Sequence, residues 1–174
     1  ELDLLMCDDE ASLDVSARRS VLDKYLGTVL EGFSGNKKKY EIVLLIDNLR
    51  RKAAALTAHI RKNEFVGDNK GNHWYNGYYD NHASKVEGGD RMMLTSQVFT
   101  IMSGVATDEE VSQIVKAADE YLYDESIGGY KLNSNFNEVK MDLGRMFGFA
   151  YGQKENGAVF CHMAVMYANS LYKR

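Results

Sequence analysis

The sequence predicts an all-α protein, and three observations lead to this fold class. Apolar residues recur every three or four positions over long stretches, which is the spacing of one face of an α-helix. The 174 residues include no proline, so no helix is forced to stop by a missing backbone N–H. The 15 glycines gather largely between the periodic stretches, where the chain has to turn.

The first two helices are predicted in the N-terminal third of the chain. The first begins near Ser16 and ends in the turn-forming stretch 32–35. The second keeps an unbroken apolar stripe from Ile42 to Ile60, with its basic residues mostly off the stripe. We therefore expect a second helix of about 20 residues.

Three more helices are predicted in the remainder of the chain. One runs from Leu94 to Ser103 and stops at a glycine. Thr107 and Glu110 have the spacing of a capping box, in which each side chain satisfies a free backbone N–H of the other residue, so a helix is expected to begin there. A last helix is expected over 157–172.

The segments between these helices are rich in glycine, asparagine and aromatic residues. Residues 64–91 are predicted to form a long loop or a short hairpin, and a long loop inside a domain is often functional. A second glycine-rich joint follows at 127–133. The stretch 138–153 fits neither a helix nor a loop clearly. No internal repeat of solenoid length is visible, and we expect one domain or part of one over 1–174.

Composition and charge exclude several classes of function. The net charge of -4 is spread along the chain and argues against nucleic-acid binding, which needs clustered Lys and Arg. No apolar run is long enough to span a membrane. Cys7 and Cys161 are isolated, so we expect two reduced, buried thiols in a cytoplasmic protein. His73 and His82 have no third ligand in register, and no metal or organic cofactor is expected.

Two clusters hold the residue types that chemistry needs. Residues 73–82 combine Trp, Tyr, Asp, Asn and His, which suits the apolar faces and hydroxyl groups of a sugar, although an aromatic loop that only packs against helices is an equal alternative. Residues 151–162 place Lys154, Glu155 and Asn156 at a loop-to-helix junction, where backbone N–H groups favour anions. His162 is expected one to two turns into that helix, where a lone histidine is more often a core residue.

Three blocks of the sequence resemble the catalytic domain of glycoside hydrolase family 94, the inverting disaccharide phosphorylases. The blocks are the run Trp74 to Asn81, the run Gln97 to Ala106 and the run Lys154 to His162, and their order and spacing agree with the family. The stretch 13–26 is most similar to the 1,2-β-oligoglucan phosphorylase branch. The resemblance covers nearly the whole chain and is strongest over 73–172.

The resemblance implies a fold and an activity. The fold is an (α/α)6 barrel of twelve helices in two rings, of which this chain would supply about half, as an incomplete toroid. The activity is phosphorolysis of a β-linked gluco-oligosaccharide or disaccharide to α-glucose 1-phosphate, with inorganic phosphate as co-substrate in place of a cofactor. Because phosphate replaces the activated water of an inverting glycosidase, one catalytic carboxyl is enough.

Site residues carry over position by position. His162 matches the phosphate-binding histidine of the family, and Lys154 matches a lysine on the acceptor side. Glu155 and Asn156 belong to the same block. A further set of candidate substrate-binding residues comes from the other two blocks: Trp74, Tyr79, Asp80 and Gln97.

The general acid of the family is harder to place. It normally lies in an Asp-Trp-Asn-Asp tetrad, which this sequence lacks. Asp8 falls nearest to that position, with Asp14 as a second candidate. The donor-binding arginine and aspartate of the family would lie before residue 1, and its second phosphate loop after Arg174. We therefore expect this chain to be part of a larger enzyme and to be inactive alone.

Two alternatives stay open beside the phosphorylase. One is a non-catalytic helical module that binds a glycan or another subunit, because the inner helices of half a barrel would leave apolar stripes open to the rest of the barrel or to a second copy. The other is a plain glycoside hydrolase on the same barrel, which would release reducing sugar without phosphate.

Overall fold

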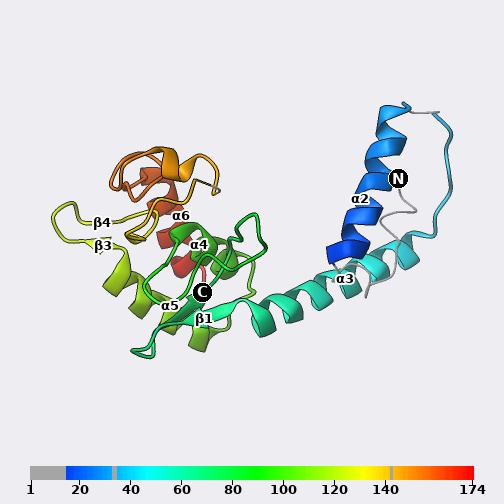
Figure 1. The fold of residues 1–174 in the computed structure, drawn as a ribbon. Helices are drawn as coiled ribbons and strands as arrows, with labels where there is room; N and C mark the ends of the chain where they lie inside the picture. Colours follow the sequence, from blue (N-terminus) through cyan, green and yellow to red (C-terminus); the bar gives the residue numbers. More distant parts are fainter. Residues whose placement is uncertain (1–14, 33–34, 142) are drawn as a thin grey trace. The chain divides into compact units, whose positions relative to one another are not determined.

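The computed structural model describes residues 15–32, 35–141 and 143–174, and side chains from residue 19 onward (Figure 1). Asp8, Asp14 and Cys7, named from the sequence, lie outside the described residues. The described part is mainly helical, with two short antiparallel ribbons and no closed sheet. The predicted all-α class is confirmed.

The chain divides into two compact units, Glu1–Ile60 and Arg61–Arg174. The predicted single domain over 1–174 stays a prediction.

The first unit contains α2, Val15–Leu30, and most of α3, Ile42–Asn63. Both helices agree closely with the predicted ranges. Their apolar stripes are open to solvent: Leu26 on α2 is 46% exposed, and Leu49 on α3 is 46% exposed. Asn48 is buried in α3. Within the described residues, this unit therefore has no apolar core of its own.

The second unit holds the core. It contains α4, Leu94–Met102, α5, Asp108–Tyr121, and α6, Cys161–Tyr172. Strands β1, Phe65–Gly67, and β2, His73–Tyr75, form an antiparallel hairpin, as one of the two alternatives for 64–91 predicted. Helix α4 packs against α6 and β2, and α5 also packs against β2. The largest fully buried apolar side chains lie where these elements meet: Trp74, Tyr75, Met92, Leu94, Val98, Ile101, Ile114, Leu122 and Tyr167.

The predicted capping box is confirmed at the start of α5. The Thr107 hydroxyl accepts a hydrogen bond from the Glu110 backbone N–H, and the Glu110 carboxylate accepts one from the Thr107 N–H at 2.8 Å. The same carboxylate accepts the Tyr75 hydroxyl at 2.9 Å. One glutamate therefore caps α5 and joins it to β2.

The last helix begins later than predicted, at Cys161 instead of residue 157. Gly157 has φ +77°, in the left-handed region, and its N–H donates to the Asn133 side chain at 2.8 Å. The Ala158 carbonyl accepts the Leu132 N–H at 3.0 Å. Residues 157–160 are therefore held by the 132–134 segment and cannot join the helix.

The glycine-rich joint at 127–133 forms a turn and a strand that the sequence analysis did not predict. Strands β3, Tyr123–Asp124, and β4, Gly129–Tyr130, pair as a ribbon. The ambiguous stretch 138–153 contains one 3₁₀ turn, η1, Met146–Gly148. A small apolar cluster of Val86, Phe136, Leu143 and Phe147 holds it in place.

The structure bears on two further expectations, one about the cysteine thiols and one about membrane-spanning helices. Cys161 is exposed, so the prediction of a buried thiol is wrong for this residue, because α6 begins there and its first turn faces solvent. Across the described residues, no helix is both long and apolar enough to cross a membrane.

Candidate functional site

The aromatic loop 73–82 has a buried half and an exposed half. Trp74 and Tyr75 are fully buried, whereas Tyr78 is 40% and Tyr79 is 44% exposed. Asp80 closes the turn that follows, because its carboxylate accepts the backbone N–H groups of His82 at 2.9 Å and Ser84 at 2.8 Å. These hydrogen bonds, with the one from Ser84 largest, hold the pKa of Asp80 below its usual range. The exposed half therefore presents two tyrosines beside an ionised carboxylate.

Two of the predicted sugar-binding residues lie beneath this surface. The Trp74 indole N–H donates to the Arg91 carbonyl at 3.2 Å. The Gln97 side chain accepts the Tyr75 N–H and donates to the Tyr75 carbonyl, both at 2.9 Å, which ties β2 to α4. With no exposed surface, Trp74 and Gln97 support the loop from below and do not form a stacking platform.

Glu87 is a central residue of this region that the sequence analysis missed. Its side chain is buried, and its carboxylate accepts the Gly77 N–H at 2.9 Å and the Ser96 hydroxyl at 2.5 Å. The chain approaches α4 so closely here that a Cβ on Gly77 would lie 2.8 Å from the Ser96 Cβ. In the sequence Glu87 is a charged residue beside a turn, and charged residues usually face solvent. Nothing in the sequence therefore marked it as buried.

Glu64 connects the exposed half of the loop to the end of α3. Its carboxylate accepts the Tyr79 hydroxyl at 2.7 Å and the Asn76 side-chain amide at 3.1 Å. Burial, and then the hydrogen bond to Glu64, raise the pKa of Tyr79 to about 12. The Tyr79 hydroxyl therefore stays protonated and points at Glu64.

The second predicted cluster is built around two buried asparagines. The Asn133 amide donates to the Asn156 side chain at 3.1 Å, and its carbonyl accepts the Gly157 N–H at 2.8 Å. Asn156 also donates to the Phe149 carbonyl at 2.8 Å. Asn156 thus shapes the turn that carries Lys154 and Glu155.

Lys154 and Glu155 lie on the surface of that turn. Lys154 has φ +46°, and its ammonium lies 4.9 Å from the centre of the Phe149 ring. Glu155 pairs with Arg145 at 3.2 Å through one carboxylate oxygen, while the other is buried without a hydrogen-bond partner among the described residues. Lys154 is the exposed cation of this block.

His162 lies at the N-terminus of α6 and not one to two turns inside it. It is the second residue of the helix and is exposed, with its ring centre 6.0 Å from that of Phe160. Phe160, the N-cap residue, makes no side-chain cap. The backbone N–H groups of the first turn have no acceptor within a helix, so His162 stands at an end that favours anions.

The aromatic loop 73–82 and the second cluster, 151–162, lie on either side of the segment 132–134. Leu94 donates its N–H to the Leu132 carbonyl at 2.8 Å, and Ser134 donates to the Met92 carbonyl at 2.9 Å. On the other side, the Leu132 N–H reaches the Ala158 carbonyl. Residues 132–134 therefore connect the base of α4, below the aromatic loop, to the turn before α6.

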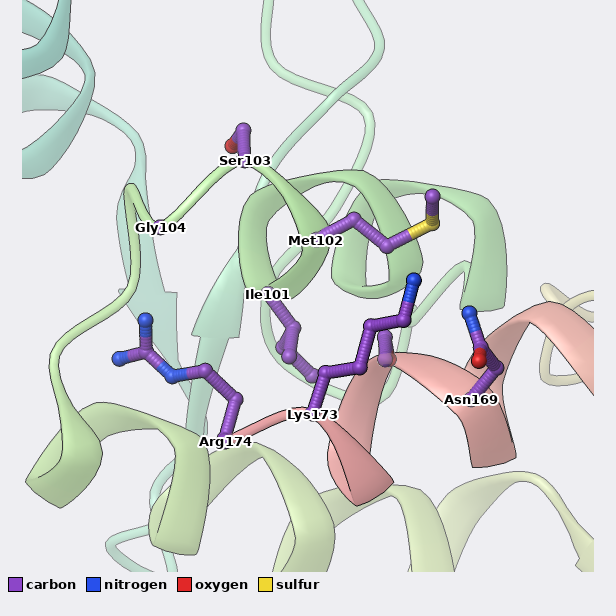
Figure 2. A pocket seen from close by; sticks show the side chains of 8 residues that line it. Ile101, Met102, Ser103, Gly104, Asn169, Lys173 and Arg174 are labelled. Atoms are coloured by element: carbon purple, nitrogen blue, oxygen red, sulfur yellow. The ribbon is translucent and has the colours of Figure 1, made fainter.

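A separate pocket of about 300 Å³ lies between the C-terminal ends of α4 and α6 (Figure 2). Lys173 and Arg174 extend from its α6 side in different directions. The Arg174 guanidinium donates to the Ala106 carbonyl at 2.8 Å and to Asp108 at 2.9 Å. The predicted site residues that the structure describes all lie outside this lining.

The described side chains include no group of three or more His, Cys, Asp and Glu that could hold a metal ion. The polar groups of both clusters are instead hydrogen-bond donors, acceptors and single charges. Such a set can bind hydroxyl groups and a small anion.

Comparison with known proteins places this arrangement in a family. The sequence model of the family "Glycosyl hydrolase 94 superfamily, catalytic domain" matches residues 29–170. The chain belongs to this superfamily. The helices therefore form part of an all-α catalytic domain, and the predicted resemblance to the glycosyl hydrolase 94 phosphorylases, with their (α/α)6 barrel, is confirmed at the level of the family.

Three curated relatives carry phosphorylase names. A solabiose phosphorylase of Paenibacillus borealis is 32% identical over 128 residues, which is 69% of this chain. A cellobionic acid phosphorylase of Neurospora crassa is 29% identical over 48% of the chain, and an N,N'-diacetylchitobiose phosphorylase of Vibrio proteolyticus is 37% identical over 46%. The matched part spans 16%, 10% and 10% of these relatives, respectively.

Proposed function

We propose that this chain carries the phosphate and acceptor side of an inverting phosphorylase. The substrate would be a β-linked gluco-oligosaccharide or disaccharide, and the product α-glucose 1-phosphate. The observation that carries the proposal is the block 154–162, which combines an exposed lysine with an exposed histidine at an uncapped helix N-terminus, inside the family match. The phosphorylase names of the relatives support it.

The phosphate would bind at the start of α6. The helix dipole and the unpaired N–H groups of the first turn attract an anion, and the His162 imidazole adds a donor. Held there, phosphate needs no general base, because it is already a nucleophilic anion. It attacks the anomeric carbon while a carboxylic acid protonates the departing glycosidic oxygen.

The sugar would lie against the exposed half of the aromatic loop and the turn at 154–156. Tyr79 and Asp80 present an aromatic face and a carboxylate, and Lys154 presents a cation on the acceptor side. Asn156, which is buried, and Glu155, which pairs with Arg145, would hold that turn in shape. Asp8 and Asp14 remain the proposed general acids.

The test is phosphate release from α-glucose 1-phosphate in the presence of sophorose, laminaribiose, cellobiose or glucose. It uses the protein as its gene encodes it. We expect His162→Ala to lower the rate by at least about 100-fold, the usual effect of removing one donor to a reacting anion. His59→Ala, on α3, is the matched control and should retain the rate. Wild-type protein that releases no phosphate with any acceptor would contradict the proposal, and reducing sugar without phosphate would indicate a hydrolase.

A second candidate function, a non-catalytic helical module that binds a glycan or a subunit, is favoured by one observation. Leu30 on α2 and Val43 on α3 are 87% and 71% exposed, so these helices offer apolar surface to a partner. The remaining barrel helices or a second copy would cover it, in a cytoplasmic protein. Sedimentation and the phosphorolysis assay of the gene-encoded protein together separate the cases: self-association without phosphorolysis favours subunit binding, and a monomer with phosphorolysis contradicts it.

A further inference from the structure

Glu87 is a buried carboxylate that joins the aromatic loop to α4. It is 5% exposed. One oxygen accepts the Gly77 N–H and the Ser96 hydroxyl, and the other accepts the Met93 N–H at 2.9 Å and the Gln97 amide at 3.3 Å. Four donors, one from the loop and three from the start of α4, therefore converge on one side chain.

The main chain of Glu87 extends this network to the surface. Its N–H donates to the Asn76 side-chain carbonyl at 3.1 Å. The Asn76 amide donates in turn to Glu64, which accepts the Tyr79 hydroxyl. A series of hydrogen bonds thus leads from the main chain of Glu87 to an exposed tyrosine of the loop.

The pattern of donors suits the ionised form of Glu87. An amide in its place would turn its NH2 group toward the Gly77 N–H or the Met93 N–H and leave that N–H unpaired. A protonated carboxyl would lose one acceptor position, and the Ser96 hydroxyl would have to turn from donor to acceptor. Burial raises the pKa of Glu87 to about 7, against the opposing effect of the hydrogen bonds from Ser96, Gly77 and Met93. The charge of Glu87 therefore changes near neutral pH.

The other charged groups of the network are on its outer side. Glu64 lies beyond Asn76, and Lys85 pairs with Glu64 at 3.7 Å. The loop and α4 present only neutral donors to the Glu87 carboxylate: the backbone N–H groups of Gly77 and Met93, the Ser96 hydroxyl and the Gln97 amide. Burial and these donors govern its ionisation.

We propose that Glu87 is a positioning residue for the sugar-binding surface formed by Tyr78, Tyr79 and Asp80. It acts through the Gly77 N–H and Asn76 and does not touch the sugar. The proposal rests on the proposed function, because it assigns the oligosaccharide to this surface and the phosphate to the start of α6. A merely structural role would lower stability without separating the two substrates.

The experiment measures phosphorolysis by the gene-encoded protein with disaccharide and phosphate varied in turn. Glu87→Gln should raise the KM for disaccharide by about fivefold or more, the effect of losing one or two hydrogen bonds in the loop. The KM for phosphate should stay within about twofold. Glu109→Gln, the same change at an exposed position on α5, is the matched control and should leave both values unchanged.

The pH profile gives the second readout. In the wild-type protein the KM for disaccharide should rise as the pH falls through about 7, since Glu87 loses its charge there. Glu87→Gln should remove this dependence. Ser96→Ala removes one donor and keeps the carboxylate, so the dependence should remain and move to higher pH. This variant also tests the proposal if Glu87→Gln does not fold.

Three results would overturn the proposal. The KM values for disaccharide and phosphate could rise together in Glu87→Gln, or its melting temperature could fall with both KM values unchanged. The profile of Ser96→Ala could match that of the wild-type protein. If the wild-type protein shows no phosphorolysis, the proposed function fails first. Calorimetry with sophorose, cellobiose and laminaribiose then tests the positioning role separately. Glu87→Gln should weaken the binding of these sugars. Binding that is absent in the wild-type protein, or unchanged in the variant, would contradict the positioning role.

Discussion

Asn133 shows, at the scale of a single residue, how a side-chain amide can take the place of main-chain pairing. It is fully buried, and it binds the Gly157 N–H, the Asn156 side chain and the Ser134 carbonyl. Gly157 is at a positive φ that ends any regular pairing. The Asn133 amide therefore joins the turn that carries Lys154 to the 132–134 segment.

Replacing this amide should be costly. Asn133→Ala leaves the buried Gly157 N–H without its acceptor, and we expect the free energy of unfolding to fall by about 1–3 kcal/mol. Urea denaturation followed by circular dichroism measures it. Asn135→Ala is the matched control, since Asn135 is exposed and accepts a hydrogen bond from the Asn137 N–H. Equal losses in the two variants would contradict the role given to Asn133.

Asp124 gives a residue-scale prediction about pH. Its carboxylate accepts hydrogen bonds from the Ser126 hydroxyl at 2.6 Å and the Ser126 N–H at 3.0 Å, and it pairs with Lys131 at 2.9 Å. The Ser126 hydroxyl, and then Lys131, lower the pKa of Asp124 to about 2. Because the folded pKa lies below the unfolded value of 3.8, Asp124 stabilises the fold above pH 3.8, and this contribution is lost as the pH falls toward about 2.

Asp124→Asn should therefore flatten the dependence of the melting temperature on pH over that interval. Differential scanning calorimetry at a series of pH values measures the slope. Asp90→Asn is the control, because the described structure gives the Asp90 carboxylate no hydrogen bond or ion pair. A slope that Asp124→Asn leaves unchanged would show that the ribbon β3–β4 does not depend on this carboxylate.

At the scale of elements, the start of α5 agrees most directly with the sequence. Thr107→Ala removes the acceptor of the Glu110 N–H and should lower the free energy of unfolding by about 0.5–2 kcal/mol. Thr107→Ser keeps the hydroxyl and should retain most of the stability. Chemical denaturation of both variants checks this, and an equally large loss in Thr107→Ser would assign the effect to the lost methyl group instead of the cap.

The elements that the sequence predicted are those whose signals are local. Apolar periodicity gave α2 and α3 within a few residues, and the capping box gave α5, because both patterns depend on neighbours along the chain. The start of α6 was placed too early, since residues 157–160 are held by Asn133 and Leu132, about 25 residues away in the sequence. Non-local pairing of this kind leaves no periodic pattern.

The candidate site shows the same division. Lys154, Asn156 and His162 were named as one candidate block because they are close in sequence, and the aromatic loop was named from its composition. Glu87, Glu64 and Asn133 were missed. Each is a common polar residue whose importance comes from burial against segments far along the chain. Sequence patterns identified the exposed candidates, and the structure was needed to find what holds them.

At the scale of the whole molecule, buried residues are distributed unequally between the two units. Apart from Asn48, all the residues described as buried lie within 61–174. Within the 61–174 unit, the Arg61 guanidinium donates hydrogen bonds to the Val105 carbonyl at 2.6 Å and to the Gly104 carbonyl at 3.1 Å. The second unit thus has the core that cooperative unfolding requires.

We therefore expect residues 61–174, produced alone, to unfold in one cooperative transition with the same urea midpoint as residues 1–174. Buried apolar surface sets the stability, and almost none of it lies in the described part of the first unit. The same truncation with Arg61→Ala is the comparison, and it should unfold at lower urea because it loses the contacts to the 104–105 turn. A lower midpoint or a broad transition for 61–174 would show that the exposed stripes of α2 and α3 contribute to the fold, because the remaining core would then be insufficient.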